Sequence, residues 1–173
     1  MYSKFKKMKK FTTKNEIDKI IGVPKCQIGK RPLYYYGNGI LISYSLKRFK
    51  VEGCERIEYG EEGMFAVSLY HFIDVEMLKE YFKLKFFEWD DIGGNSDNVI
   101  DEDVTYGKTF AEIHDLGLNK KYVNHYREGE NCVLVDGKLA VQNLFIMYGT
   151  YTLFFRGKSK KNKIAGFQFT FAE

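Results

Sequence analysis

A helix-start signature appears twice in this chain and constrains the fold more than any other feature. Thr13 is followed by Glu16, and Thr109 by Glu112, in each case three positions later. A threonine hydroxyl at a helix cap can accept a hydrogen bond from the third helical amide, while the glutamate carboxylate returns to the amide of the cap. Both sites therefore predict the start of a short helix.

Similar sequences follow the two predicted starts. Apolar residues three or four positions apart lead to Gly22 and Gly117, and glycine readily enters the left-handed conformation that ends a helix. Farther along, Tyr-Gly pairs at residues 36–37 and 148–149 precede strand-like segments. We interpret the chain as one unit, a helix followed by a meander, that is used twice. The alternative is chance recurrence of two common motifs.

The predicted fold class is α+β, with two tandem units of a short helix plus an antiparallel β-meander that could form one curved sheet. We place the first half at residues 11–73, a connecting helix and acidic loop at residues 74–106, and the second half at residues 107–173. Strands are expected at residues 33–36, 40–46, 54–59, 64–70, 132–135, 139–141, 150–155 and 164–171.

Two of these segments carry further information. In residues 40–46, Ile40, Ile42 and Tyr44 alternate with serines in the later positions, which is typical of a strand covered on one face. Asp136-Gly137 separates two strand-like segments and suits a type I′ hairpin turn, in which both central residues have positive φ. Residues 122–130 are polar and are expected to be irregular.

The connecting segment begins with a third predicted helix. Asp74 is a suitable cap, and the apolar side chains that follow form a stripe at helical spacing, which we expect to pack on the sheet: Met77, Leu78, Tyr81 and Phe82. Residues 84–89 fit either a helix or a strand. Residues 90–103 are acidic and glycine-containing, which predicts a loop at the boundary between the halves.

Composition limits the function classes. The chain has 27 basic and 23 acidic residues, a formal charge of +4, which is below the excess typical of a dedicated nucleic-acid binder. Residues 1–10 are lysine-rich and are interpreted as a mobile, solvated arm, with binding to an anionic surface as the alternative. No signal-peptide pattern or membrane-length apolar run is present, so we expect a cytoplasmic protein without membrane contact.

Motifs for catalysis are absent from the sequence. The 3 cysteines are far apart and the 3 histidines have no metal-ligand spacing, so neither a metal nor a cofactor is predicted. Phosphate-binding glycine loops and a nucleophile elbow are also missing. We therefore expect a protein that is not an enzyme.

Aromatic side chains are the main candidates for a binding surface, since 17% of the residues are aromatic. Tyrosine and tryptophan often anchor protein interfaces. The predicted partner-binding residues are Tyr34, Tyr36, Tyr148, Tyr151 and Trp89, followed by the acidic residues Asp97, Asp101 and Asp103. The alternative is that these rings close the sheet against the helices.

A family resemblance rests on three segments, residues 13–24, 34–37 and 56–58. Together they resemble the repeating unit of the small outer-membrane lipoprotein A and β-lactamase inhibitory protein group, in which a helix ending in Leu-Gly-x-Pro precedes an aromatic strand and a meander. The first half matches over residues 12–60, and the second over residues 109–171. The resemblance implies two units whose aromatic sheet surface grips an enzyme. The chain departs from the group in having no leader-like segment, lipid-attachment cysteine or paired cysteines.

These observations predict a non-catalytic protein that binds and inhibits another protein. The most concrete form is an intracellular immunity protein that neutralises a toxin enzyme inside a producing bacterium. The alternative is a nucleic-acid-associated protein or nuclease-like enzyme that uses the basic N-terminal arm and the loop from Lys158 to Lys163. In the first case we expect at most weak, non-specific binding to nucleic acid.

Overall fold

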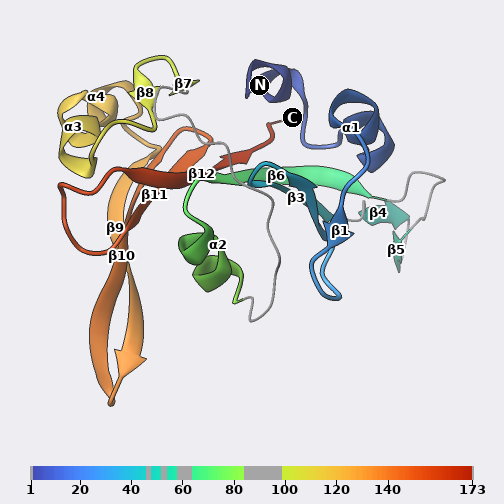
Figure 1. Cartoon of the computed structure of the whole chain (residues 1–173). Coiled ribbons are helices and arrows are strands. Elements are labelled where there is room, and N and C mark those ends of the chain that lie inside the picture. Colours follow the sequence, from blue (N-terminus) through green and yellow to red (C-terminus); the bar gives the residue numbers. More distant parts are fainter. Residues whose placement is uncertain (1, 46–47, 52–53, 58–63, 84–98, 173) are drawn as a thin grey trace. The chain divides into compact units, whose positions relative to one another are not determined.

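The computed structural model describes residues 2–45, 48–51, 54–57, 64–83 and 99–172 (Figure 1). Its large antiparallel sheet and short helices confirm the predicted α+β class. Eight strands form the sheet in the order β1-β2-β3-β6-β12-β11-β10-β9. Contacts divide the chain into a first unit, Met1–Tyr70 with Phe169–Glu173, and a second unit, His71–Gln168. The connecting segment predicted at residues 74–106 thus belongs to the second unit, and the last residues of the chain belong to the first.

Where the structure describes it, the first unit contains two helical segments and six strands, of which β6 continues past its boundary. These are η1 (Tyr2–Lys7), α1 (Lys14–Ile21), β1 (Cys26–Gln27), β2 (Leu33–Gly37), β3 (Ile40–Ser45), β4 (Arg48–Val51), β5 (Cys54–Ile57) and β6 (Phe65–Phe72). β4 and β5 pair as a separate two-stranded sheet, and neither β1 nor β4 was predicted from the sequence.

Helix α1 begins with the predicted reciprocal cap. The Thr13 hydroxyl accepts a hydrogen bond from the Glu16 amide at 3.3 Å, and the Glu16 carboxylate accepts one from the Thr13 amide at 2.7 Å. Ile17 is fully buried, and Gly22, with φ 93°, follows the last helical residue. The predicted helix and its glycine end are therefore confirmed.

The lysine-rich N-terminus is not a mobile arm, so that prediction is wrong. Residues Tyr2–Lys7 form a 3-10 helix, and the side chains of Phe5 and Met8 are buried. The Lys10 amide donates a hydrogen bond to the Ala172 carbonyl at 2.6 Å, which fixes this segment to the C-terminal residues of the same unit. The surrounding lysines concealed an apolar pair, three positions apart, that is sufficient to hold one turn.

Strand β3 is more fully covered than its sequence pattern suggested. Ile40, Ile42 and Tyr44 are buried as predicted, but Leu41 on the opposite face is also buried. The half-covered pattern therefore applies only to its later residues, where Ser43 is partly exposed and Ser45 exposed.

Among its described residues, the second unit contains three α-helices and six strands. These are α2 (Val75–Phe82), β7 (Val99–Asp101), β8 (Val104–Thr105), α3 (Phe110–Asp115), α4 (Leu118–Lys121), β9 (Tyr126–Val135), β10 (Lys138–Tyr148), β11 (Tyr151–Arg156) and β12 (Ile164–Thr170), the last of which continues past its boundary. α4 was not predicted. The predicted irregular segment at residues 122–130 is wrong, because β9 starts at Tyr126 and pairs with β10 along its length. Its polar residues concealed the strand.

The predicted acidic loop at residues 90–103 lies mostly outside the described residues, as do residues 84–89. Its described end is not a loop, since Val99–Asp101 pairs with Val104–Thr105 as a short hairpin. Glu102 occupies the turn with φ 39°, a positive value that residues other than glycine rarely adopt.

Helices α2 and α3 lie on opposite faces of β11. Phe154 and Phe155 are successive residues of β11, so their side chains point to opposite faces. Phe154 contacts Tyr81 of α2, with ring centroids 4.9 Å apart, and Phe155 contacts Phe110 of α3 at 5.2 Å. Figure 1 shows the two helices on either side of this strand. In the predicted apolar stripe of α2, Met77, Leu78 and Phe82 are buried, whereas Tyr81 is 37% exposed although its ring contacts the sheet.

The N-terminal caps of α1 and α3 are joined to a strand of the large sheet in the same way, which supports the interpretation of a repeated unit. Thr13 forms an antiparallel bridge with Phe65, at the start of β6, and Thr109 forms one with Lys163, next to the start of β12. In the first unit, Lys14 N–Met64 O is 3.0 Å and Ala66 N–Thr12 O is 2.7 Å. The second unit has the equivalent two hydrogen bonds, between the residues that flank Thr109 and those that flank Lys163. They are Phe110 N–Asn162 O and Ile164 N–Lys108 O, each at 3.1 Å.

Strand order within the units agrees with this repetition. The first unit has the order β1-β2-β3-β6, and the second has β9-β10-β11-β12. In both, the helix bridges to the strand that closes the meander. The β4–β5 hairpin is inserted between the third and last strands of the first unit, whereas residues 157–163 connect the corresponding strands of the second.

Candidate functional site

The longest strands of the protein form a hairpin that extends past its neighbour in the sheet (Figure 1). β11 pairs with β10 only over Leu144–Tyr148, whereas the β9–β10 register continues to Val135 and Lys138. Residues 132–141, which we call the arm, therefore consist of two strands without a third strand beside them in the described part of the chain. A two-stranded hairpin on its own is marginally stable in water.

The turn at the end of the arm has the geometry that the sequence predicted. Asp136 has φ 49° and Gly137 φ 74°, and the closing pair is Val135 with Lys138. Positive φ at both central residues is typical of a type I′ turn, whose twist matches that of the strands. The turn thus holds the register in which Leu134 lies opposite Leu139 and Val133 opposite Ala140.

Apolar side chains cover both faces of the arm and are open to solvent. Leu134 and Leu139 share one face and are 73% and 77% exposed, respectively. The opposite face carries Val133 and Val135, which are also exposed. Cys132, a free thiol, lies on the face of Leu134. Contiguous exposed apolar surface in a folded protein typically marks an interaction site.

The base of the arm is held firmly by the second unit. A bulge between Val141 and Asn143 ends the arm on β10, and the buried Asn143 side chain accepts a hydrogen bond from the Gly157 amide at 2.8 Å. On β9, Gly129 lies under the ring of Phe145, where an added Cβ would come within 2.3 Å of a ring carbon. The base of the arm is therefore fixed to the neighbouring strands of the second unit.

The two tyrosines predicted as anchors in the second half are core residues. Tyr148 is 0% exposed and Tyr151 is also buried, and their rings stack with centroids 5.3 Å apart. Burial is the main cause of the raised pKa of Tyr148. Their expected role as surface anchors is wrong, because the turn at Gly149 directs both rings inward against Tyr122 and Phe167.

The two predicted tyrosines of the first unit are half-buried and are occupied within it. The Tyr36 hydroxyl donates a hydrogen bond to Asp18 of α1 at 2.9 Å, and the Lys14 ammonium lies 5.2 Å from the centroid of the Tyr34 ring. Burial raises the pKa of Tyr36, and the hydrogen bonds to Tyr44 and Asp18 raise it further. These rings join α1 to β2, so the alternative that aromatic residues close the sheet describes them better.

Of the four remaining predicted site residues, the structure describes only Asp101 and Asp103. Trp89 and Asp97 lie outside the described residues. Asp101 ends β7, and Asp103 is exposed beside it, while the neighbouring Glu102 pairs with Lys121 at 2.6 Å. Among the described residues, no three His, Cys, Asp or Glu side chains are placed to hold a metal ion.

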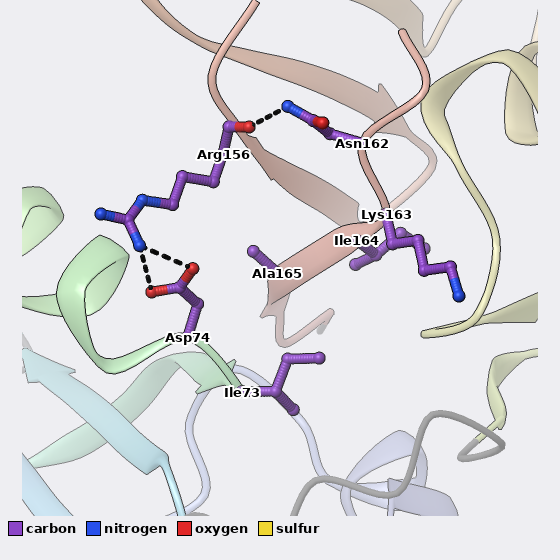
Figure 2. Close-up of a pocket in the computed structure, with 7 residues that line it drawn as sticks. All are labelled: Ile73, Asp74, Arg156, Asn162, Lys163, Ile164 and Ala165. Carbon is purple, nitrogen blue, oxygen red and sulfur yellow. Dashed lines mark hydrogen bonds and ion pairs between the residues drawn. The ribbon is translucent and has the colours of Figure 1, made fainter. Parts of the chain in front are cut away.

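A pocket of about 470 Å³ in the second unit contains a different set of polar groups (Figure 2). It is lined by Ile73, Asp74, Arg156, Asn162, Lys163, Ile164 and Ala165. Arg156 points to Asp74, with distances of 3.2 and 3.3 Å to the two carboxylate oxygens, and the Asn162 amide donates to the Arg156 carbonyl. Lys163 points away from this pair (Figure 2). The charges of Arg156 and Asp74 thus neutralise each other. The residues that line the pocket include no nucleophile paired with a base.

The sequence contained a signal for the arm that its interpretation missed. Short strands were predicted on both sides of Asp136-Gly137, but their residues were assigned no surface role. A half-buried strand alternates apolar and polar residues, whereas residues 132–135 are apolar at every position. Such a run normally indicates burial on both faces, and only the structure shows that nothing in the described chain covers it.

Comparisons with known proteins give no match from which a role for the site could be taken. No protein-family model matches the chain, and neither the curated proteins nor the solved structures that were searched give a match. Separately, none of the described helices combines the length and apolarity needed to cross a bilayer.

Proposed function

We propose that this protein acts by binding another protein through the arm, without catalysing a reaction. The observation that carries the proposal is the exposure of Leu134 and Leu139 at 73% and 77% on a two-stranded projection. Covering apolar surface contributes roughly 25 cal/mol per Å², so a partner that encloses the arm gains affinity from both of its faces. A narrow projection that is apolar on both faces fits a cleft better than a flat surface.

Its most concrete form is a cytoplasmic immunity protein of a bacterium, which inhibits a toxin enzyme by inserting the arm beside or into the enzyme's active-site cleft. Two features support this form. The repeated helix-and-meander unit has the organisation expected from the resemblance to the inhibitory-protein group, and the arm supplies a projecting apolar contact. The inhibited enzyme, rather than this chain, provides the catalytic residues.

The test compares an arm variant with a matched surface variant. Leu134→Ser combined with Leu139→Ser removes the exposed apolar pair of one face, and Val123→Ser changes another 74% exposed apolar residue outside the arm. Proteins retained by the immobilised wild-type chain from lysate of the source cells are identified by mass spectrometry, purified, and titrated against all three chains by calorimetry.

We expect the purified partner to bind the arm variant at least ten-fold more weakly, since a few anchors usually carry most of the interface energy. The Val123→Ser variant should bind like the wild type, and all three chains should melt together because the changed residues are exposed. If the partner is an enzyme, wild-type chain should inhibit its activity. Equal binding by the arm variant, or retention of no specific protein, would contradict the proposal.

A second function, binding to nucleic acid, is favoured only by the basic loop beside the pocket. Lys158, Lys160 and Lys161 are exposed there. We expect duplex DNA to bind weakly near 50 mM salt and to be released by about 200 mM, as counterions displace a non-specific contact. Tight, sequence-dependent retention in a gel-shift assay would replace the protein-binding proposal.

A further inference from the structure

We propose that the partner adds an extended strand to the open edge of β9, with apolar residues opposite Cys132–Val135 and a basic residue opposite Glu130. This inference rests on the proposed function and specifies how the arm is recognised. In this mode, backbone hydrogen bonds supply affinity and alternate side chains supply specificity.

The edge of β9 offers unused backbone groups. In the part of the chain that the structure describes, β9 is the last strand in the sheet order and pairs with β10 alone. A two-residue turn closes on a hydrogen-bonded pair, here Val135 with Lys138, and such pairs alternate along an antiparallel ladder. Leu134 and Cys132 therefore lie at the positions whose N–H and C=O groups point away from β10, toward the open edge.

Natural edge strands are usually protected against pairing by charged side chains, especially lysine, by proline or by bulges. Residues 131–135 of β9 contain no charged residue and no proline, and the bulge between Val141 and Asn143 is on the inner strand. This part of the edge, flanked by apolar side chains on both faces, is suited to accept another strand.

Charge specifies one end of the incoming strand. Within residues 128–135 the charged side chains are Glu128 and Glu130. Glu128 is engaged by His114 and by the Tyr126 hydroxyl, and these hydrogen bonds lower its pKa against the opposing effect of burial. Glu130 is exposed. A lysine or arginine opposite Glu130 forms a favourable cross-strand pair.

A second copy of this chain fits the edge less well. Two copies of β9 would pair antiparallel about a two-fold axis. If the axis passes through Gly129, Glu128 of each copy lies opposite Glu130 of the other. If it passes through one of residues 131–133, Glu130 lies opposite an apolar side chain or Asp136. Centring at the tip avoids these contacts but pairs only residues 132–135. The partner strand therefore belongs to a different protein.

The test uses a displayed library of random twelve-residue peptides, selected on the full chain. We expect enriched peptides to alternate apolar residues and to carry lysine or arginine near one end. Cys132→Pro deletes an outward N–H and should weaken the binding of synthetic copies at least ten-fold, whereas Cys132→Ser, which keeps that N–H, should change it less than two-fold. Glu130→Lys should reverse the preference in favour of peptides with glutamate at that end.

Hydrogen exchange provides a readout that does not depend on a folded proline variant. In the wild type, the amides of Cys132 and Leu134 should exchange at least ten-fold more slowly when peptide is bound. Unprotected amides, full binding by Cys132→Pro, or selection of no arm-dependent peptide would overturn strand addition. The proposed function would still stand if the Leu134→Ser, Leu139→Ser double variant lost its protein partner while the wild type and Val123→Ser kept it. Protection that rises with chain concentration without peptide would identify a second copy as the occupant, and protection by phosphatidylcholine vesicles alone would identify a lipid surface; either result overturns the proposal.

Discussion

The carboxylate of Asp74 stabilises helix α2 and also binds the guanidinium of Arg156. It accepts a hydrogen bond from the Met77 amide at 3.0 Å, and Arg156 Nη1 approaches its two oxygens at 3.2 and 3.3 Å. One side chain thus connects the start of α2 with the end of β11 in the second unit. The hydrogen bond to the helix amide and the ion pair with Arg156 differ in exposure, so they should contribute differently to the free energy of unfolding.

Asp74→Ala should lower the free energy of unfolding by about 1 kcal/mol or more, because an N-cap acceptor is lost. Arg156→Gln should cost less than about 1 kcal/mol, since the Arg156 side chain is 48% exposed and exposed ion pairs contribute little. Urea unfolding of both variants gives the comparison, with Asp74→Asn as the control that keeps a cap but loses the charge. A larger loss from Arg156→Gln than from Asp74→Ala would show that the ion pair dominates.

The duplicated caps give a second prediction. Thr13→Ala and Thr109→Ala should each cost roughly 1 kcal/mol of unfolding free energy, because each removes the acceptor for a helix amide. The sites lie in different units and share no partner, so the double variant should lose approximately the sum. Thr→Ser at either site keeps the hydroxyl and should be nearly neutral. A midpoint in urea that does not move at one site would mean that its helix contributes nothing to cooperative unfolding.

These caps also show what local sequence could establish. A capping box involves residues three apart, so the starts at Thr13, Asp74 and Thr109 and the turn at Asp136-Gly137 followed from neighbours in the chain. The inward direction of Tyr148 did not follow, because it depends on the course of β10 and β11 together. Exposure of the arm was hidden for the same reason: an apolar run looks alike whether a distant segment covers it or not.

The glutamates of the two caps predict a pH dependence of stability. Backbone and side-chain hydrogen bonds from Thr13 lower the pKa of Glu16 below its ordinary 4.5, and Thr109 has the same effect on Glu112. A carboxyl whose pKa is lowered by folding stabilises the folded state above its unfolded pKa, and this contribution is lost as pH falls through the folded value. The stability difference between wild type and Glu16→Gln should therefore be present at pH 7 and shrink below pH 4.5. Urea titrations at a series of pH values measure it, and a difference that grows toward acid would contradict the assigned cap.

Tyr148 predicts an unusual response to the loss of a hydroxyl. Its oxygen is buried and has no hydrogen-bond partner among the described residues. Since an unpaired buried polar group costs free energy, Tyr148→Phe should leave stability unchanged or raise it, by up to about 1 kcal/mol. Tyr148→Ala should cost roughly 3 to 5 kcal/mol, because it removes a core ring. Thermal melting separates the two, and a clear loss in Tyr148→Phe would reveal a partner for the hydroxyl, such as an ordered water.

The last prediction connects the base of the arm with its proposed use. In Gly129→Ala, the new methyl carbon would meet the Phe145 ring at 2.3 Å, so the ring must move. This would also change its contact with Arg127, whose guanidinium lies 5.9 Å from the ring centroid. We expect a loss of about 1 to 3 kcal/mol in folding stability, as for other overpacked sites. If the orientation of the arm matters for binding, partner affinity should fall as well, although Gly129 lies below the apolar tip. The Gly129→Ala, Phe145→Leu double variant makes room for the methyl group and should recover part of both losses. Recovery of stability without recovery of affinity would show that the Phe145 ring, rather than the direction of the arm, contacts the partner.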